Sequence, residues 1–209
     1  MTQVPIQEGI DFLKNECYIP LDQLEASRHF IYNSGEKKKI GPKYYPKYFI
    51  PPIGWTAIAL KVSHKYTDNT WIGNTNEDGE WYVGYHGVKT KDSINNIFYR
   101  SFRRGTGQDY KNHNNINPLT NISYPKCGEG VYFAQNIDDA KSYCNIIQSN
   151  NLNKYRVVFM CRINPNTVRI SNISENRDYM IVNGDKLDDI YGTMKTNEVR
   201  PYKILLLKE

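Results

Sequence analysis

The spacing of hydrophobic residues changes along the chain, and the first fifty residues differ from the rest. Apolar residues recur every three or four positions from Ile6 to Cys17, which predicts a helix. Leu21, Leu24 and Phe30 predict a second short helix. The stretch EKKKIGPKYYPKYFIPPIG follows and is typical of a solvated linker or of a basic arm that binds a partner. We therefore predict a helical and basic N-terminal extension over residues 1–53.

Residues 54–209 show a mixed pattern of short apolar segments. WYVGYHGV alternates aromatic and β-branched residues with glycines, which predicts a strand that ends in a tight turn. Residues 93–102 place Ile94 and Ile97 on one face of a helix, whereas GWTAIALKV fits a helix or a strand. The polar segment 104–126 is long for a loop, which is typical of a functional or disordered segment.

The second half of the chain is dominated by strand patterns. GVYFA, YRVVFMCRI, TVRIS, DYMIV and RPYKILLL each predict a strand, and NIDDAKSYCNIIQ predicts a helix. Asn136 is suited to cap that helix, and Asp138 and Asp139 in its first turn complement the helix dipole. Many short strands with few helices favour an α+β fold of packed antiparallel sheets over a doubly wound parallel sheet.

Composition narrows the range of functions. The 209-residue chain carries a net charge of +5, which suits an anionic ligand such as a dinucleotide or a nucleic acid, or simply keeps the protein in solution. The four cysteines show no CxxC pairing, which predicts free thiols in a reducing compartment, cytoplasmic or nuclear, and no metal site. Neither a membrane span nor a secretory signal is predicted. No GxGxxG or GxxxxGK[ST] motif supports a Rossmann or P-loop site.

Three separate segments carry the functional signal. They are YHG at residues 85–87, GEGVYFAQNIDDAKSYC at residues 128–144, and NRDYMIV at residues 176–182. In this order they resemble the H-Y-E class of ADP-ribosyltransferases, the poly(ADP-ribose) polymerase-like catalytic domain. That family has a His-Gly pair, a G-[IV]-Y-F-A strand leading into a helix with a tyrosine, and a later strand that begins Glu-Tyr-Ile-Val. The resemblance covers roughly residues 54–207 and implies two packed antiparallel β-sheets with flanking helices around a central NAD cleft.

The resemblance implies a role for each matching residue. His86 would hold a ribose hydroxyl of NAD, and the backbone of Gly87 would bind the nicotinamide carboxamide. Tyr132 and Tyr143 would stack on the two faces of the nicotinamide ring. Asp178 matches the catalytic glutamate of the family and would stabilise the positive charge that develops on the ribose. The remaining residues of the implied NAD site are Phe133, Ala134 and Ala140.

Two of these residues depart from the family pattern. Asp178 is one methylene shorter than glutamate, which shortens its reach by about 1.3 Å, and a misplacement of about 1 Å can cost about 100-fold in rate. Chain elongation relies on that glutamate in the family, so polymer synthesis is not expected. Ala140 stands where the family often has a hydroxyl that contacts the carboxamide, and the missing hydrogen bond is worth about 1 kcal/mol.

The resemblance implies an enzyme that transfers a single ADP-ribose from NAD to an acceptor protein or nucleic acid and releases nicotinamide. The alternatives are a catalytically silent module that binds NAD, ADP-ribose or nucleic acid, an NAD glycohydrolase, and a 2′-phosphotransferase that acts on RNA ends. Glu198 and Glu175 are rival carboxylates to Asp178. Basic residues around the polar segment are either solvated or contact a pyrophosphate or acceptor; they are Arg100, Arg103, Arg104 and Lys111.

Overall fold

The structure is a computed structural model that describes residues 3–62, 65–66, 68–104, 114–124, 130–174, 177–182 and 197–209, with only the backbone at 124, 172–174 and 177–178. Its helices are α1 (Ile6–Glu16), α2 (Lys91–Arg100) and α3 (Ile137–Ser142), with three short 3₁₀ helices η1 (Leu21–Gln23), η2 (Ala26–Arg28) and η3 (Thr70–Ile72). Its strands are β1 (Phe30–Ile31), β2 (Lys38–Ile40), β3 (Lys47–Phe49), β4 (Thr56–Ala59), β5 (Tyr82–Gly87), β6 (Asn115–Ile116), β7 (Ser123–Tyr124), β8 (Val131–Ala134), β9 (Ile147–Gln148), β10 (Lys154–Ile163), β11 (Val168–Ser174), β12 (Arg177–Val182) and β13 (Val199–Lys208).

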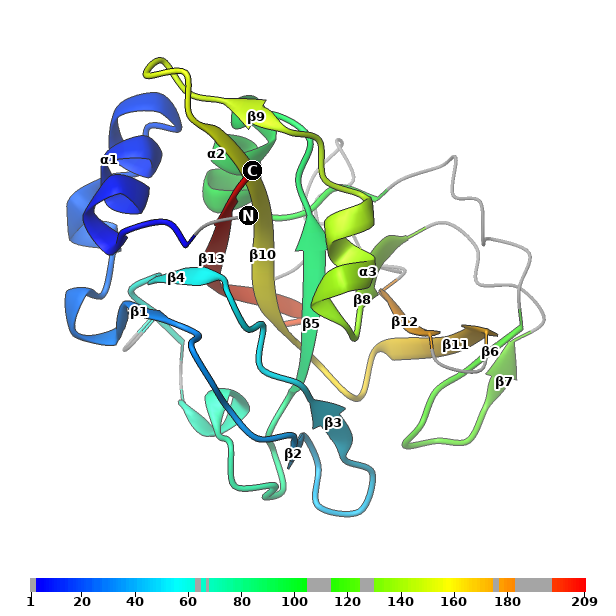
Figure 1. Cartoon of the computed structure of the whole chain (residues 1–209). Helices are drawn as coiled ribbons and strands as arrows, with labels where there is room; N and C mark the ends of the chain where they lie inside the picture. Colours follow the sequence, from blue (N-terminus) through cyan, green and yellow to red (C-terminus); the bar gives the residue numbers. More distant parts are fainter. Residues whose placement is uncertain are drawn as a thin grey trace.

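The strands pair antiparallel throughout the described residues. The main sheet has the order β1-β4-β13-β10-β5-β8-β12-β11-β6-β7, with β9 attached to β10, and β2 and β3 form a separate hairpin. In Figure 1, β10, β13 and β5 run roughly upright, whereas β12, β11 and β6 extend sideways from them. The α+β prediction is therefore confirmed. The predicted division into two packed sheets is not confirmed. The strands from β1 to β5 and the strands from β8 to β7 in this order are joined into one hydrogen-bonded sheet.

The join between the two halves is narrow. β5 pairs with β10 at six residue pairs but with β8 at the single pair Tyr85↔Ala134. Beyond that pair the two strands separate, and the backbone of β5 loses its neighbour on one side. This gap in the sheet positions the candidate site.

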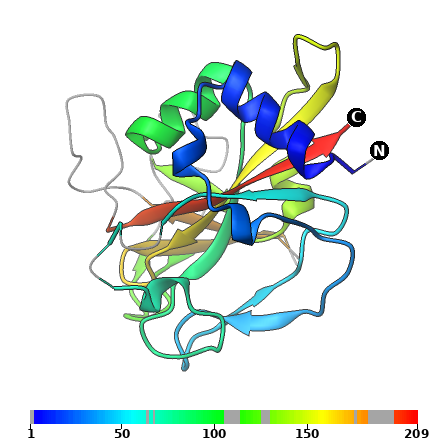
Figure 2. The same ribbon diagram turned by 90° about the vertical axis from the view of Figure 1, so that its left-hand side faces the viewer.

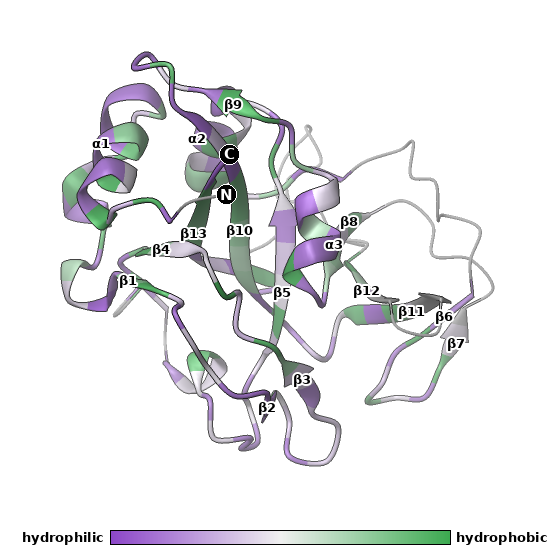
Figure 3. Cartoon of the chain, viewed as in Figure 1, coloured by the Kyte–Doolittle hydropathy of each residue, from purple (hydrophilic) through white to green (hydrophobic). Residues whose placement is uncertain are grey.

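The centre of the core is β10, which is covered on both faces. Nine of its ten residues pair with β13, and the apolar run of β10 is almost entirely buried. Phe159 packs against Phe102, which follows α2, whereas the neighbouring Met160 accepts a weak hydrogen bond from the hydroxyl of Tyr32. Successive residues of a strand point to opposite faces, so the two sides of the sheet are covered by different parts of the chain. Figure 2 shows α1 and α2 above the sheet and the β2–β3 hairpin below it, and Figure 3 shows hydrophobic colours concentrated in β10 and β13.

The N-terminal segment shares the core of the rest of the chain. The predicted helix is present as α1, and Val4, Leu13 and Ile19 are fully buried in the single hydrophobic cluster. Gly9 lets α1 approach the sheet closely, since a Cβ there would lie 3.3 Å from the side chain of Leu206. The stretch predicted to be a linker contains the β2–β3 hairpin, in which Phe49 is buried. Residues 3–53 thus cover one edge of the sheet and parts of both of its faces (Figure 2).

Two helix predictions differ from the structure. The helix predicted over NIDDAKSYCNIIQ is capped by Asn136, which accepts from the backbone N–H of Asp138 as expected, but it ends at Ser142. The chain turns there because the thiol of Cys144 is buried and donates to the carbonyl of Val157 in β10. The second predicted N-terminal helix is instead the pair of 3₁₀ helices η1 and η2. Within the described residues no helix is long and apolar enough to cross a membrane.

The contribution of α1 to the core can be measured by substitution. Leu13→Ala removes a side chain that is fully buried, so we expect the free energy of unfolding to fall by about 2–5 kcal/mol. Leu21→Ala is the matched control, because Leu21 is 49% exposed and its loss should change stability by less than about 0.5 kcal/mol. Urea unfolding of both variants provides the measurement. If Leu13→Ala lowered the free energy of unfolding as little as Leu21→Ala does, α1 would not be part of the cooperative unit.

Candidate functional site

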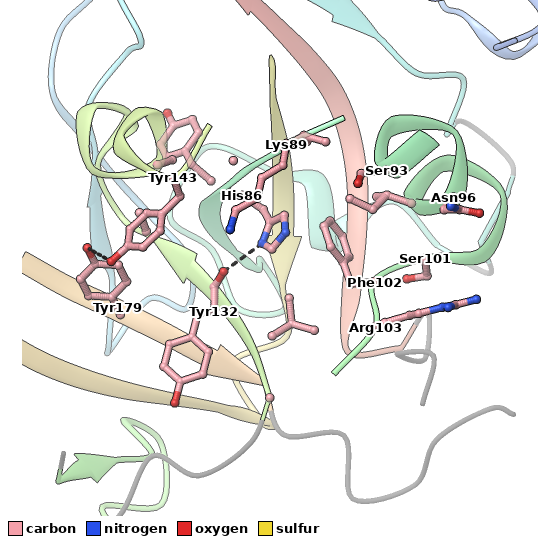
Figure 4. Close-up of a pocket in the computed structure, with 18 residues that line it drawn as sticks. His86, Lys89, Ser93, Asn96, Ser101, Phe102, Arg103, Tyr132, Tyr143 and Tyr179 are labelled. Atoms are coloured by element: carbon pink, nitrogen blue, oxygen red, sulfur yellow. Dashed lines mark hydrogen bonds between the residues drawn. The ribbon is translucent and has the colours of Figure 1, made fainter. Parts of the chain in front are cut away.

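A cavity of about 490 Å³ opens where β5 and β8 separate, between α2 on one side and the end of α3 on the other (Figure 4). Its volume lies within the range of small-molecule sites. Six of the eight residues implied by the family resemblance line it, and they come from β5, β8 and α3 with the residue that follows α3. They are His86, Gly87, Tyr132, Ala134, Ala140 and Tyr143.

The imidazole of His86 has a defined hydrogen bond. Its Nδ1 lies 3.0 Å from the backbone carbonyl oxygen of Tyr132. A carbonyl oxygen only accepts hydrogen bonds, so Nδ1 carries the proton when the ring is neutral. The other ring nitrogen, Nε2, then holds a lone pair and acts as an acceptor in the cavity wall. This arrangement suits a ligand hydroxyl group that donates to Nε2.

Aromatic packing fixes the same ring. The imidazole lies edge-on to Phe102, with the ring centroids 4.9 Å apart, and its centroid is 5.5 Å from that of Phe133. Burial lowers the pKa of His86, and the hydrogen bond with the Tyr132 carbonyl opposes this shift without reversing it. His86 is therefore neutral at pH 7 and presents an oriented acceptor to the cavity.

Gly87 is required by packing on its α3 side. A Cβ at this position would lie 2.4 Å from the backbone oxygen of Ala140 and 2.9 Å from Sγ of Cys144. Neither atom is the end of a flexible side chain, so a larger residue would push α3 away from β5. The family resemblance implies a role for the Gly87 backbone in binding the carboxamide, and the close contact with α3 is a separate reason for a glycine at this position.

The backbone of Gly87 is directed into the gap between the strands. Along an antiparallel strand, alternate residues turn their N–H and C=O groups to one neighbour and then to the other. The N–H of Val88 donates to the carbonyl oxygen of Val157 in β10, so the preceding residue, Gly87, directs its backbone groups away from β10. Continued pairing with β8 would place Gly87 opposite Tyr132, but pairing stops at Tyr85, and the Tyr132 carbonyl binds His86 instead. Gly87 thus offers a donor and an acceptor at the cavity edge.

Besides the buried Tyr85 of β5, three tyrosines from different elements line the cavity. Tyr132 belongs to β8, and in Figure 4 its ring extends away from the imidazole that its backbone binds. Tyr143 follows the last residue of α3 and is 39% exposed, so it is not a residue of a buried helix face. Its hydroxyl lies 3.4 Å from that of Tyr179, and the two rings are perpendicular with centroids 6.3 Å apart. The cavity therefore has an aromatic wall on the side of α3 and β12.

The remaining residues predicted for the site are not among the described residues that line the cavity. Phe133 is fully buried behind the imidazole and does not line the cavity, so its contact is with His86. The backbone at position 178 lies in β12 directly before Tyr179, and its side chain is outside the described part of the structure. The rival Glu198 is buried directly before β13, where its carbonyl accepts from the N–H of Asn164 just after β10, and it does not line this cavity. Glu175 and Lys111 lie outside the described residues.

The sequence analysis missed several residues of the cavity wall. Tyr179 adjoins the predicted carboxylate in DYMIV, and this adjacency was the available signal. Ser101 ends α2 with φ 67° and ψ −171°, a conformation that strains any residue other than glycine. Its hydroxyl is buried and has no hydrogen-bond partner among the described residues. Strain and an unsatisfied hydroxyl in one cavity wall are features of binding sites, and no sequence pattern marked them.

The described part of the wall is basic. Lys89 after β5 and Arg103 after α2 both line the cavity, and none of the described lining residues is acidic. Such a wall favours ligands with a phosphate or carboxylate group. Within the described ranges, no cluster of three or more histidine, cysteine, aspartate or glutamate residues could hold a metal ion. Comparisons with protein-family models, with curated proteins and with solved structures found no match for this chain.

The two described histidines should differ in tautomer, which tests the geometry at His86. Nδ1 of His86 donates to a carbonyl, whereas Nδ1 of His29 accepts from the backbone N–H of Ala59, so His29 carries its proton on Nε2. We expect ¹⁵N NMR at pH 7.5 to show opposite tautomers for these two rings. The same tautomer in both would contradict the His86–Tyr132 hydrogen bond.

The pH dependence of stability follows from the same ring. Burial lowers the folded-state pKa of His86, so the unfolded chain binds more protons below about pH 6.5. We expect this histidine to contribute a loss of stability as the pH falls through that value, and His86→Gln to reduce the slope. Chemical denaturation at pH 7.5 and pH 5.5 measures the difference between the wild type and the variant.

Proposed function

We propose that this chain is an ADP-ribosyltransferase of the H-Y-E type, with the corresponding fold, and that it transfers one ADP-ribose from NAD to a macromolecular acceptor. The observation that carries the proposal is the convergence of His86, Gly87, Tyr132 and Tyr143 on one cavity. These residues come from segments up to 57 positions apart in the chain. Each of them presents the chemical group that its proposed role requires.

Nicotinamide binding draws on Gly87 and the tyrosines. A carboxamide carries one donor group and one acceptor group in a plane, and the outward-directed N–H and C=O of Gly87 complement both. The aromatic wall that includes Tyr143 suits the flat, positively charged nicotinamide ring, which is attracted to the face of a phenol ring. Binding the leaving group in this way lowers the barrier to its departure.

Ribose and phosphate binding draw on the opposite wall. Nε2 of neutral His86 accepts a hydrogen bond from a ribose hydroxyl and fixes the sugar beside the nicotinamide. Lys89 and Arg103 line the cavity on the α2 side, where their charges complement a pyrophosphate. The basic wall and the acceptor nitrogen together match the polar half of NAD.

The reaction exchanges one bond to the ribose for another. The C1′–N bond to nicotinamide breaks, nicotinamide departs with the electron pair, and C1′ acquires positive charge. Asp178 is the carboxylate that we assign to stabilise this charge, since position 178 lies in β12 next to the cavity residue Tyr179. An acceptor nucleophile then bonds to C1′, and its proton passes to the carboxylate or to water.

A specific feature favours a second candidate, a silent module that binds NAD or ADP-ribose. Ala140 lines the cavity and is almost completely buried, so a methyl group stands where the family often has a hydroxyl. This lowers the affinity for nicotinamide and with it the strength of leaving-group binding. Under this candidate the same cavity retains the ligand without breaking the glycosidic bond.

The activity test uses labelled NAD with protein or nucleic acid acceptors and compares four proteins. Labelled macromolecule supports the transferase, free ADP-ribose alone supports a hydrolase, and retained NAD binding without turnover supports the silent module. We expect His86→Ala to lower the rate at least 100-fold, because it removes an oriented transition-state contact. Asp178→Ala should abolish turnover, whereas Tyr48→Ala, an exposed tyrosine of β3 outside the cavity, should leave it unchanged. Equal rates for wild type and His86→Ala would end the proposal.

Ala140→Ser probes the carboxamide subsite directly. The added hydroxyl restores a hydrogen bond worth about 1 kcal/mol, so we expect nicotinamide and NAD to bind about fivefold more tightly. The matched control is Ala134→Ser, which adds a hydroxyl to another part of the wall and should not strengthen nicotinamide binding. Calorimetric titration with nicotinamide separates the two variants. Unchanged affinity in both would place the carboxamide elsewhere.

A further inference from the structure

A second cavity, of about 430 Å³, lies on the opposite face of the sheet from His86. It is bounded by the inner side of the β2–β3 hairpin, by the segment around η2, and by β10 and β13. Met160 and Arg162 of β10 line it, whereas Phe159, the residue before Met160, packs toward Phe102 beside the first cavity. The two cavities are therefore separated by the sheet, and the function proposed above makes no use of the second.

Lys203 of β13 is the central basic group of this cavity. Its Nζ lies 4.1 Å from the ring centroid of Phe30 and donates to the hydroxyl of Tyr32 at 3.3 Å, with the ring of Tyr202 5.7 Å away. Among the described residues it has no carboxylate partner. Burial, together with the charges of Arg162, Arg28 and Lys38, lowers the pKa of Lys203 to about 8. A charged lysine without a counterion, held among three aromatic rings, is costly unless an anion approaches it.

Arg162 of β10 adds a second unbalanced cation. Only 3% of its surface is exposed, and its guanidinium donates to the backbone carbonyls of Trp81, Ile72 and Gly73. These acceptors are neutral, so they position the guanidinium without neutralising its charge. Its Nε is buried and has no hydrogen-bond partner among the described residues. The arginine is thus held rigidly at the cavity wall with one donor unused.

The cavity carries an excess of positive charge from four separate elements. Arg28 of η2 and Lys38 of β2 line it together with Lys203 and Arg162, and the only acidic residue in its described lining is Glu25. The carboxylate of Glu25 accepts from the hydroxyl of Ser27 rather than from any of these cations. Like charges at this density repel one another, and a bound anion would relieve that repulsion.

We propose that this second cavity binds a phosphate group, either as the free ion or as the monoester of a small molecule. A phosphate monoester carries close to two negative charges at pH 7 and offers three acceptor oxygens, which match several converging donors better than one carboxylate does. The volume exceeds what a phosphate ion fills, and the aromatic side chains of the wall provide stacking surface for an attached ring. The inference is independent of the enzymatic activity proposed for the first cavity.

The test measures binding of three probes by calorimetry: inorganic phosphate, adenosine monophosphate and adenosine. We expect saturable binding of the first two and much weaker binding of adenosine. Tighter binding of the monophosphate than of phosphate identifies an organic monoester as the ligand class, and equal binding identifies the free ion. Binding of adenosine as tightly as the monophosphate, or no saturable binding of any probe at 10 mM (roughly the weakest affinity of a specific site), would refute the proposal.

Two adjacent lysines of β2 provide a matched pair of variants. Lys38 lines the cavity and Lys39 does not, although both are exposed lysines on the same short strand. We expect Lys38→Ala to weaken phosphate binding about tenfold and Lys39→Ala to leave it unchanged, with both proteins folded. Equal weakening by the two substitutions would indicate non-specific attraction to net charge and would overturn the assignment. Phosphate binding should survive in Lys89→Ala, because Lys89 lines the first cavity and not this one, and this variant therefore separates the two sites.

The pH profile tests the role of Lys203 itself. The groups facing its ammonium are Arg162 from β10, Arg28 from η2, Lys38 from β2, Glu25, the hydroxyl of Tyr32 and the ring of Tyr202. Because the pKa of Lys203 is about 8, its charge is lost between pH 7.5 and 9, a range in which a phosphate monoester keeps its charge. We expect the affinity to fall over this range in the wild type and to be weak but pH-independent in Lys203→Met. A flat profile in the wild type would exclude Lys203 from the site.

Discussion

The separation of β5 from β8 after one residue pair is the constraint on which the candidate site depends. Continued pairing would place Gly87 against Tyr132 and would use their backbone groups within the sheet. Instead the imidazole of His86 binds the Tyr132 carbonyl, so one side chain bridges the strands where the backbone ladder stops. The packing of Ala140 against Gly87 keeps α3 at the edge of the resulting gap. The cavity, the orientation of the histidine and the unpaired edge of β5 therefore share one cause.

The central strand β10 lies between the two cavities. β10 directs Phe159 toward the aromatic packing that holds His86, and directs Met160 and Arg162 toward the basic cavity on the other face. The first fifty residues are essential to this second face, because η2, β1 and the β2–β3 hairpin enclose it. A segment that resembled a linker in the sequence thus forms the wall of a cavity.

Local patterns in the sequence predicted the elements better than their assembly. Helical spacing located α1, and apolar runs located β10 and β13, because periodicity reflects burial directly. The β2–β3 hairpin was not predicted, because its strands are only three residues long and the prolines and lysines around them are typical of a linker. The end of α3 depended on a distant contact, the burial of Cys144 against β10. The convergence of His86, Tyr132 and Tyr179 depends on the long-range pair Tyr85↔Ala134, which no local pattern encodes. Ser101 was missed because its backbone conformation and its unsatisfied hydroxyl leave no mark in the sequence.

The bond between His86 and the Tyr132 carbonyl also limits what the imidazole can do. The Nδ1 proton of the ring is held by a backbone oxygen, and burial disfavours a second proton on the ring. The imidazole is therefore poorly suited to accept and release protons as a general acid or base at neutral pH. Any chemistry in this cavity that releases a proton must export it by another route, through a carboxylate, the solvent or the incoming molecule. Its fixed orientation suits the histidine to position a bound molecule rather than to relay protons.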